Sequence, residues 1–263
     1  MVSLIALALV VAPGAHLVQA ASGDTVPGGI VAGVTVGQPP GPGAAGSACT
    51  WRRADPHDAH LGRGGEVSRL IADRRYWLYE RWCADDIDLV WVPELAPGTL
   101  AEHAADEVRR LIPEPQVATA PPADAGVVQA PMWFWVPEAS WQAIEATAWV
   151  PVDDGVLWAT ARAVPTSLWL DPGDGPGGAT PVTCAGPGPR WTHAHGDDAL
   201  SPCSVTYRHS SESAPSGTHR AVLRVVWSTS WTASTGEGGP LEPLYSQVTL
   251  PVAVNEIHAL VSH

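Results

Sequence analysis

Short segments in which apolar and polar residues alternate fill the chain from residue 141 onward, and they constrain the fold more than any other feature. Alternation with a period of two places one set of side chains on each face of an extended strand. Residues that favour turns, mainly glycine, proline, serine and aspartate, separate the segments. The expected strands are 141–151, 155–163, 165–171, 180–186, 203–209, 219–234 and 242–261. Because no helical periodicity interrupts them, residues 138–263 are expected to form an immunoglobulin-like β-sandwich of two sheets.

Residues 49–137 are expected to form a separate, small α+β domain. Alternation predicts strands over 74–83 and 86–93, and a strand that is apolar on both faces over 127–137. The fold class expected for the whole chain is therefore mainly β, with a small α+β part before the sandwich.

One helix is expected, over residues 99–112. Thr99 and Glu102 have the spacing of a capping box, in which both side chains bond to free backbone amides. Pro113 is expected to end the helix. Its inner stripe is expected to consist of Leu100, Ala104, Val108, Leu111 and Ile112.

The first residues have the pattern of a secretory signal peptide. An apolar run over 4–12, too short to span a bilayer, precedes Ala20 and Ala21, and cleavage is expected after one of these. No basic residue precedes the run, and a buried N-terminal strand is the alternative interpretation. Once residues 1–21 are removed, the protein is expected to be extracellular, secreted or attached to the cell surface, and not membrane-spanning. Residues 22–48, rich in glycine and proline, are expected to form a flexible linker.

The chain contains four cysteines, Cys49, Cys83, Cys184 and Cys203. An even number of cysteines in an exported chain indicates disulfide bonds. Of the three possible pairings, Cys49–Cys83 with Cys184–Cys203 is favoured, because each pair then falls within one expected domain. A zinc site is the alternative, but such sites use closely spaced cysteines, which this sequence lacks.

The formal net charge is −13, and the chain contains no lysine. A negative surface repels phosphate backbones, so nucleic acid is not expected as a partner. A nucleotide is not expected either, because the phosphate-binding loop GxxxxGK[ST] requires a lysine. The expected partner is a protein or another component of the cell envelope.

The segments 165–175 and 203–227 resemble the PKD (polycystic kidney disease-type) domain, in which a tryptophan-bearing strand ends in a Gly-Asp-Gly turn. The residues that match the family pattern are Trp169, Gly173, Asp174, Gly175, Tyr207 and Gly217. The chain departs from the family at Asp171-Pro172, where members usually have an aspartate followed by an aromatic residue or methionine. The resemblance implies an immunoglobulin-like sandwich that mediates protein interaction or acts as a structural spacer.

Residues 49–263 are also similar to a group of secreted proteins of high-GC Gram-positive bacteria. The matching stretches include TCAGPGPRW (183–191), SPCSVTY (201–207) and VNEIHAL (254–260). This similarity implies secretion.

Two clusters combine histidine with aspartate and could hold a divalent metal. They comprise Asp55, His57, Asp58 and His60 in one loop, and His193, His195, Asp197 and Asp198 in another. Two imidazoles two residues apart would point the same way if they lay on a strand. A solvated loop is the commoner explanation for both clusters, and no metal or other cofactor is expected.

Asp171 and Asp174 flank the glycine turn and could bind Ca²⁺, although their spacing differs from that of an EF-hand. The more ordinary role for Asp174 is to accept hydrogen bonds from the amides of its own turn. The sequence favours the turn role.

Two pairs of tryptophans share a face of their expected strands, Trp133 with Trp135 and Trp227 with Trp231. Exposed pairs of this kind can stack on sugar rings, which would make the protein a carbohydrate-binding or cell-wall-binding module. Tryptophan more often lies in a core, where it removes a large apolar area from water. Core packing is the commoner explanation, and a sugar platform is the alternative.

The sequence shows no pattern of catalytic residues. The motifs GxSxG and HExxH are absent, and acidic pairs such as Asp153-Asp154 fall in expected turns. The protein is therefore expected to be a non-enzymatic, secreted or cell-surface protein with a PKD-like module.

Overall fold

The computed structural model describes residues 49–57, 65–83, 86–153, 155–196, 199–214 and 216–256, together with the backbone of 30–31 and 35–36. Strands make up 52% of the structure and helices 11%. The chain is thus mainly β with a small helical part, as the sequence predicts. Within the described ranges, no helix is long and apolar enough to cross a membrane.

The structure divides into two compact units, each built from separate stretches of the chain. Unit 1 contains the described residues up to Ala104 with Ala146–Thr160 and Ala233–Glu237, and unit 2 contains Ala105–Glu145, Ala161–Thr232 and the described residues from Gly238 onward. The domain boundary expected after residue 137 does not coincide with this division. Strand β9 (Pro131–Trp135) pairs with β13 (Ser204–Thr206), so the stretch before residue 137 belongs with the C-terminal strands. A pairing between segments so far apart in the sequence leaves no mark on local alternation.

Unit 1 contains a five-stranded sheet in the order β1-β6-β5-β3, with β4 also paired to β5. Its longer strands, β5 (Arg74–Cys83) and β6 (Asp86–Pro93), have the expected bounds, and β3 (Thr50–Arg53) and β4 (Ser68–Ile71) flank β5. Ala54, Leu78 and Trp91 form a buried cluster. The disulfide Cys49–Cys83 joins the residue before β3 to the end of β5, which confirms the first expected pairing.

Part of the segment expected to be a flexible linker is in strands. β1 (Ile30–Val31) pairs in parallel with β6, and β2 (Thr35–Val36) pairs in antiparallel with β10. These four residues are β-branched and favour the extended conformation, which explains the difference. The expected signal peptide and the rest of the expected linker lie outside the described residues.

The helix α1 (Pro97–Leu111) begins two residues earlier than expected. Proline at the first helical position already has the required φ angle, so the helix begins at Pro97 and Thr99 lies inside its first turn rather than at the cap. Leu100, Ala104 and Val108 are fully buried, as expected, whereas Leu111 is 49% exposed. The buried stripe therefore ends at Val108, one turn before Leu111, which is the last residue of the helix.

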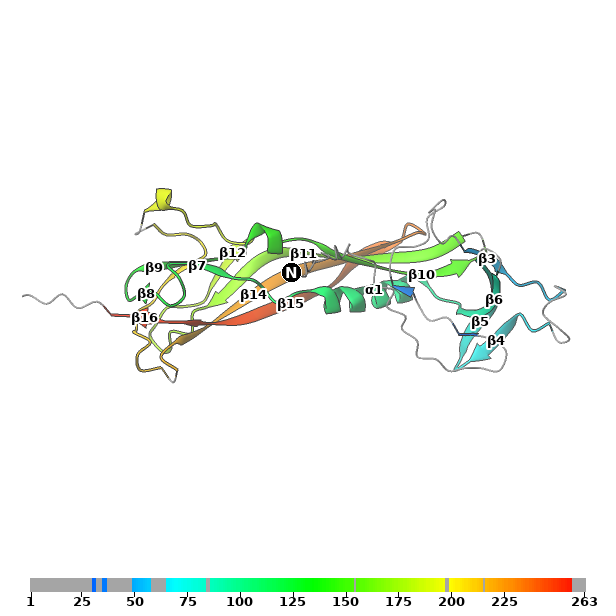
Figure 1. The fold of residues 1–263 in the computed structure, drawn as a ribbon, viewed down its shortest axis with the longest axis horizontal. Coiled ribbons are helices and arrows are strands. Elements are labelled where there is room, and N and C mark those ends of the chain that lie inside the picture. Colours follow the sequence, from blue (N-terminus) through cyan, green and yellow to red (C-terminus); the bar gives the residue numbers. More distant parts are fainter. Residues whose placement is uncertain are drawn as a thin grey trace, which may run out of the picture. The chain divides into compact units, whose positions relative to one another are not determined.

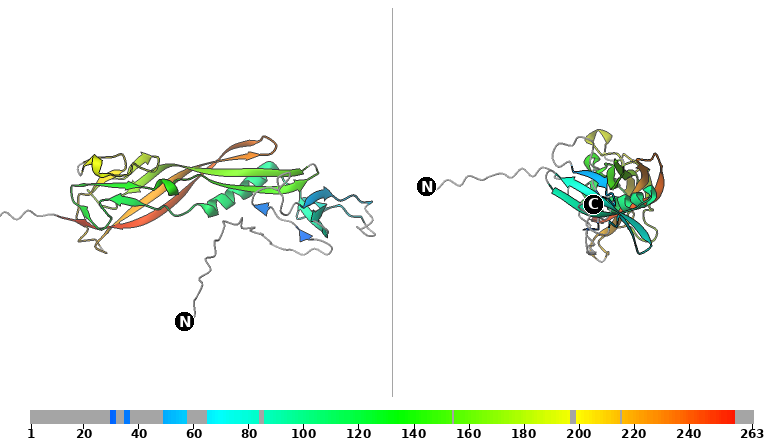
Figure 2. Two further views of the ribbon diagram at one scale, coloured as in Figure 1. Left: turned by 45° about the horizontal axis from the view of Figure 1, so that its top comes forward. Right: turned by 90° about the vertical axis from the view of Figure 1, so that its right-hand side faces the viewer.

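A six-stranded sheet has the order β15-β14-β11-β10-β2, with β12 paired to β11 (Figure 1). Its strands are β10 (Ile144–Val152), β11 (Gly155–Asp171), β12 (Val182–Ala185), β14 (His219–Ala233) and β15 (Gly238–Val252). β14 and β15 form a long antiparallel hairpin, which the left view of Figure 2 shows clearly.

β11 is one continuous strand where the sequence predicts two. From Ala159 to Pro165 the odd-numbered residues of the strand are buried, but beyond Pro165 Leu168 and Leu170 are the buried ones. Such a change of phase is typical of an irregularity in a β-ladder, and irregular positions are where strands tolerate proline. The expected break between 163 and 165 is therefore a change of the buried face and not the end of a strand.

Two smaller sheets complete unit 2. One has the order β13-β9-β7, where β7 is Ala118–Ala120, and the other pairs β16 (Val254–Asn255) with β8 (Gly126–Val127). The disulfide Cys184–Cys203 joins β12 of the large sheet to the residue before β13, which confirms the second expected pairing. The assignment of these sheets to an immunoglobulin-like sandwich stays a prediction.

Candidate functional site

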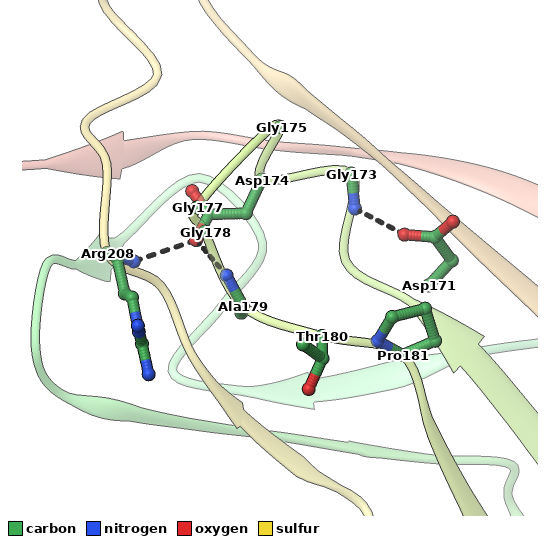
Figure 3. A pocket seen from close by; sticks show the side chains of 10 residues that line it. All are labelled: Asp171, Gly173, Asp174, Gly175, Gly177, Gly178, Ala179, Thr180, Pro181 and Arg208. Carbon is green, nitrogen blue, oxygen red and sulfur yellow. Dashed lines mark hydrogen bonds between the residues drawn. The ribbon is translucent and has the colours of Figure 1, made fainter.

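The Gly173-Asp174-Gly175 turn follows β11, and its aspartate is only 4% exposed. The Asp174 carboxylate accepts hydrogen bonds from the backbone N–H groups of Ala179 at 2.6 Å, Arg208 at 2.8 Å and His209 at 3.2 Å. Figure 3 shows the carboxylate directed at the amides of Ala179 and Arg208, whereas the Arg208 side chain extends away from it. The expected turn role is confirmed, and Asp174 also binds a second segment more than thirty residues further along the chain.

Two histidines surround the buried carboxylate. The Nδ1 atom of His209 lies 3.2 Å and the Nε2 atom of His219 3.7 Å from Asp174 Oδ1. Burial alone would raise the pKa of Asp174, but the three amides and the nearby His209 imidazole together hold this pKa below its ordinary value. His219 in turn stacks on the buried ring of Tyr207, at 5.2 Å between centroids. The cluster therefore stabilises an ionised carboxylate inside unit 2.

An aspartate close to two histidines also occurs in catalytic sites, where a nucleophile lies next to the base. Here Asp174 accepts bonds from backbone amides, and His219 Nε2 donates to the backbone oxygen of His209 at 3.0 Å. The buried Ser211 hydroxyl donates to Gly217 O at 2.8 Å and accepts a bond from Val254 N. These polar groups hold backbone segments together, so we assign the cluster a structural role.

The hollow beside this turn has a volume of about 660 Å³, and four of its ten lining residues are glycines (Figure 3). Gly173 has a φ of +69°, and a Cβ atom there would lie 2.4 Å from Arg220 O. Asp171 Oδ1 accepts a hydrogen bond from Gly173 N at 3.0 Å, so both carboxylates that could have held Ca²⁺ face N–H donors. The lining offers few side chains that could specify a ligand.

A second hollow in unit 2, called the aromatic groove below, has a volume of about 750 Å³. This size lies within the range of sites for small ligands, about 300–1,000 Å³. The side chains that characterise its lining are Trp133, Trp135, Trp191, Pro121, Pro122, Pro131, Arg190, Thr192 and His193. Aromatic and apolar residues with a few polar groups are the composition typical of binding sites.

The floor of the aromatic groove is formed by β7 and β9. Ala118 lies opposite Trp135 in the ladder, and Ala120 and Ser204 lie on either side of Trp133. Directly opposed residues of paired strands share one face of the sheet. Because each tryptophan has only small neighbours on this face, a hollow remains beside the indole rings.

The wall of the groove is the loop that follows β12. Val136 N donates to Pro187 O at 2.8 Å, so the loop runs along the end of β9. Gly188 has a φ of +82°, and a Cβ atom there would lie 2.7 Å from Phe134 O and 3.0 Å from Cys203 Sγ. The Cys184–Cys203 disulfide closes the same loop, with a sequence separation of 19. The wall is thus anchored before the chain reaches Arg190 and Trp191.

Two of the three indole N–H groups in the groove have acceptors within the protein. Trp133 Nε1 donates to Ala199 O at 2.8 Å, and Trp191 Nε1 donates to Gly196 O at 3.4 Å. His195 lies against Trp133 and His193 against Trp191, with ring centroids 5.0 Å and 4.9 Å apart. Because Trp133 is buried, only the half-buried Trp191 of this pair can present ring surface to a ligand, and its N–H group is already used.

The charge of the groove differs from that of the whole chain. Among the described residues, no aspartate or glutamate lines it, and its lining includes the exposed Arg190. Arg190 forms no ion pair with any residue in the part of the chain that the structure describes. In a chain of net charge −13, Arg190 is therefore a local positive charge at the groove.

Core packing, the explanation that the sequence favours, is confirmed for Trp133 and Trp227, which are only 4% and 2% exposed. The alternative, a platform of exposed tryptophans, is excluded for these two residues. Trp135 and Trp231 are half-buried. Trp191 and Arg190 form the accessible part of the groove and were not among the expected site residues. The pattern that could have identified them is a tryptophan next to an arginine in a Gly/Pro-rich loop between paired cysteines.

The expected metal clusters are only partly described. The His193 and His195 rings contact different tryptophans, and Asp55 Oδ1 accepts a bond from His57 N at 2.8 Å. Asp58, His60, Asp197 and Asp198 lie outside the described residues. Among the residues that are described, no group of three or more metal-binding side chains is present.

Comparison with protein-family models, with curated proteins and with solved structures gives no match for this chain. The function of the aromatic groove therefore has to be inferred from its own chemistry.

Proposed function

We propose that the protein is exported and acts outside the cytoplasm as a non-enzymatic binding module whose aromatic groove holds a carbohydrate chain of the cell envelope. The groove itself carries this proposal. Its half-buried tryptophans, Trp135 and Trp191, border a hollow of about 750 Å³. Indole rings stack on the C–H faces of pyranose rings, and Arg190, Thr192 and His193 supply polar groups for sugar hydroxyls.

A binding experiment with insoluble cell-wall polysaccharide, freed of protein and nucleic acid, tests this function. We expect the wild-type protein to sediment with the polysaccharide and the variant Trp191→Ala to stay in solution, because the variant lacks one ring surface of the groove. Tyr245→Ala is the matched control, since Tyr245 is 60% exposed and lies outside the groove. Equal retention of the wild-type protein and Trp191→Ala would disprove the carbohydrate role of the groove.

The two disulfides support the exported location, because such bonds form and persist in oxidising compartments. Export also predicts removal of the signal peptide. Mass spectrometry of protein recovered from the producing cells should show a new N-terminus at Ala21 or Ser22. Full-length protein that keeps Met1 and remains in the cytoplasm would contradict this part of the proposal.

The long strands support a second candidate function, that of a PKD-like structural spacer. β11 has 17 residues, and β14 and β15 have 15 each, so each strand is about 50 Å long. Complementation of a deletion strain separates the two functions. A spacer predicts full complementation by Trp191→Ala, whereas a binding module predicts loss of function.

A further inference from the structure

We infer that the aromatic groove selects glycans whose pyranose rings carry a carboxylate, and that Arg190 binds the carboxylate. This inference rests on the proposed carbohydrate-binding function and names the class of sugar. It starts from the charge of the groove, whose lining contains Arg190 and, among the described residues, no acidic side chain, although the chain carries a net charge of −13. A neutral glycan could accept hydrogen bonds from Arg190, but only an acidic one would also form an ion pair with it.

The position of Arg190 relative to the aromatic wall also fits an acidic sugar. Arg190 precedes Trp191 directly in the chain, and both side chains line the same hollow. In a uronic acid the carboxylate projects from the edge of the pyranose ring. A ring stacked on an indole face therefore directs its carboxylate sideways, towards a neighbouring residue of the wall. The guanidinium of arginine suits this role because its planar N–H groups can pair with both oxygens of a carboxylate.

The state of Arg190 leaves its charge available to a ligand. The side chain is exposed and has no ion-pair partner among the residues that the structure describes. Other arginines differ in this respect. Arg162, for example, pairs with Glu145 at 2.7 Å, and Arg53 pairs with Asp153 at 2.9 Å. A ligand carboxylate would thus not have to displace a partner among the described residues.

Aromatic grooves with prolines also bind proline-rich peptides, but the hydrogen-bond donors of this groove favour a sugar. A polyproline helix presents backbone carbonyl groups, which need donors from the protein. The indole N–H groups of Trp133 and Trp191 already donate to Ala199 and Gly196, which leaves the N–H of Trp135 as the one indole donor without an acceptor among the described residues. The half-buried rings of Trp135 and Trp191 offer mainly apolar surface, which is what the C–H face of a sugar requires.

The experiment is a calorimetric titration of the full-length, disulfide-bonded protein with two matched probes. One is α-1,4-linked tetragalacturonate, and the other is its carboxyl-reduced form, in which each carboxylate is replaced by a primary alcohol. We expect the acidic probe to bind at least about tenfold more tightly than the reduced one, and Arg190→Gln to remove this preference. Trp191→Ala should weaken the binding of both probes. Arg220→Gln, which removes an exposed arginine of unit 2 outside the groove, should bind like the wild-type protein.

Each other outcome rejects a defined part of the argument. Equal affinity for the two probes, or an unchanged preference in Arg190→Gln, overturns the role of Arg190 and leaves the carbohydrate function in place. Absence of binding to both probes overturns the selection of carboxylated glycans, while the cell-wall experiment above still decides the general function. Tighter binding of an oligoproline peptide than of either sugar overturns the glycan in favour of a peptide. Near-ultraviolet circular dichroism of each variant shows that its fold is retained.

Discussion

In unit 2, Asp174 and Gly188 each determine the conformation of a turn, and they do so in opposite ways. Asp174 does so with a charge, since its buried carboxylate accepts bonds from amides of its own turn and of residues 208 and 209. Gly188 does so by having no side chain, because the backbone of Phe134 and the Cys203 sulfur occupy the space that a Cβ atom would take. Besides the local bond to Ala179, the contacts of Asp174 reach residues 208 and 209, and Gly188 lets its loop approach Phe134 and Cys203, so both residues bring distant segments together.

We expect Asp174→Asn to lower the free energy of unfolding by about 3 kcal/mol at neutral pH, because an amide replaces a carboxylate that accepts several backbone bonds. Denaturant titration measures the loss. Asp171→Asn is the control, since Asp171 accepts the Gly173 amide from an exposed position, and it should cost about 1 kcal/mol or less. Equal losses in the two variants would show that the buried carboxylate has no special role.

The lowered pKa of Asp174 also predicts that the stability difference between the wild-type protein and Asp174→Asn depends on pH. The pKa of Asp174 is lowered in the folded protein, so its contribution is complete above the unfolded value of about 4 and is lost as the pH falls through the folded value. His209 Nδ1 lies beside this carboxylate and helps to hold its pKa down. The stability difference between the wild-type protein and Asp174→Asn should therefore persist from neutral pH down to about pH 5 and shrink below about pH 4. A difference that grows below about pH 4 would contradict the assigned direction.

Gly188→Ala should cost about 3 kcal/mol in the free energy of unfolding, because a methyl group would meet Phe134 O at 2.7 Å in addition to the cost of a positive φ. Gly186→Ala is the matched variant. Gly186 also has a positive φ, +69°, but a Cβ atom there would have no neighbour within 4 Å. It should cost only about 1 kcal/mol. Thermal unfolding of both proteins compares the two losses.

At the scale of elements, local patterns predicted most strands, and long-range packing decided the rest. The bounds of β5 and β6 follow from alternation alone, and α1 was expected within two residues. The continuity of β11 past Pro165 could not be predicted from the sequence. A change in alternation at a proline looks the same whether one strand ends there or a single strand continues with its other face buried.

The candidate site shows the same limit. The spacing of Trp133 and Trp135 predicts that both lie on one face of β9. Trp191, which lines the same groove, comes from a loop more than fifty residues further along the chain, and no local pattern connects it to β9. Which of these rings is buried depends on the residues that pack on each side of the strand. Trp133 fills the core, and Trp135 borders the hollow. Alternation gives the face of a residue but not what covers that face.

The two disulfides offer a matched comparison between elements. By the chain-entropy relation, the double variant Cys184→Ala/Cys203→Ala should lose about 3 kcal/mol and Cys49→Ala/Cys83→Ala about 4 kcal/mol. Only the first should also lose binding in the groove, because only this disulfide anchors the wall. Chemical denaturation and titration with cell-wall fragments measure the two effects. Unchanged binding in the Cys184→Ala/Cys203→Ala variant would show that the wall keeps its position without the cross-link.

At the scale of the whole molecule, the dominant property is a net charge of −13 with arginine as the only cationic side chain besides histidine. Several arginines pair with carboxylates or lie over tryptophan rings, as Arg53 does over Trp77 at 3.3 Å and Arg69 over Trp91 at 3.7 Å. Their charges are therefore partly compensated within unit 1. The net charge of the chain is negative, and Arg190 is one of the arginines without an ion pair among the described residues.

This charge predicts that the protein does not bind nucleic acid. In an electrophoretic mobility experiment at moderate salt, duplex DNA should migrate equally with and without the protein, because polyanion and protein repel each other. A basic DNA-binding protein at the same concentration serves as the positive control. A shift that disappears as salt is raised would reveal a basic surface and contradict the prediction.

The loop that ends at the Cys184–Cys203 cross-link has a consequence for engineering. Between Arg190 and His195 the chain takes part in no strand of any sheet, and both ends of the loop are fixed by covalent or backbone contacts outside this segment. Its side chains can therefore be randomised at little cost to folding. A library of variants restricted to this short stretch, screened by surface display, should yield proteins that recognise other polymers on an unchanged scaffold.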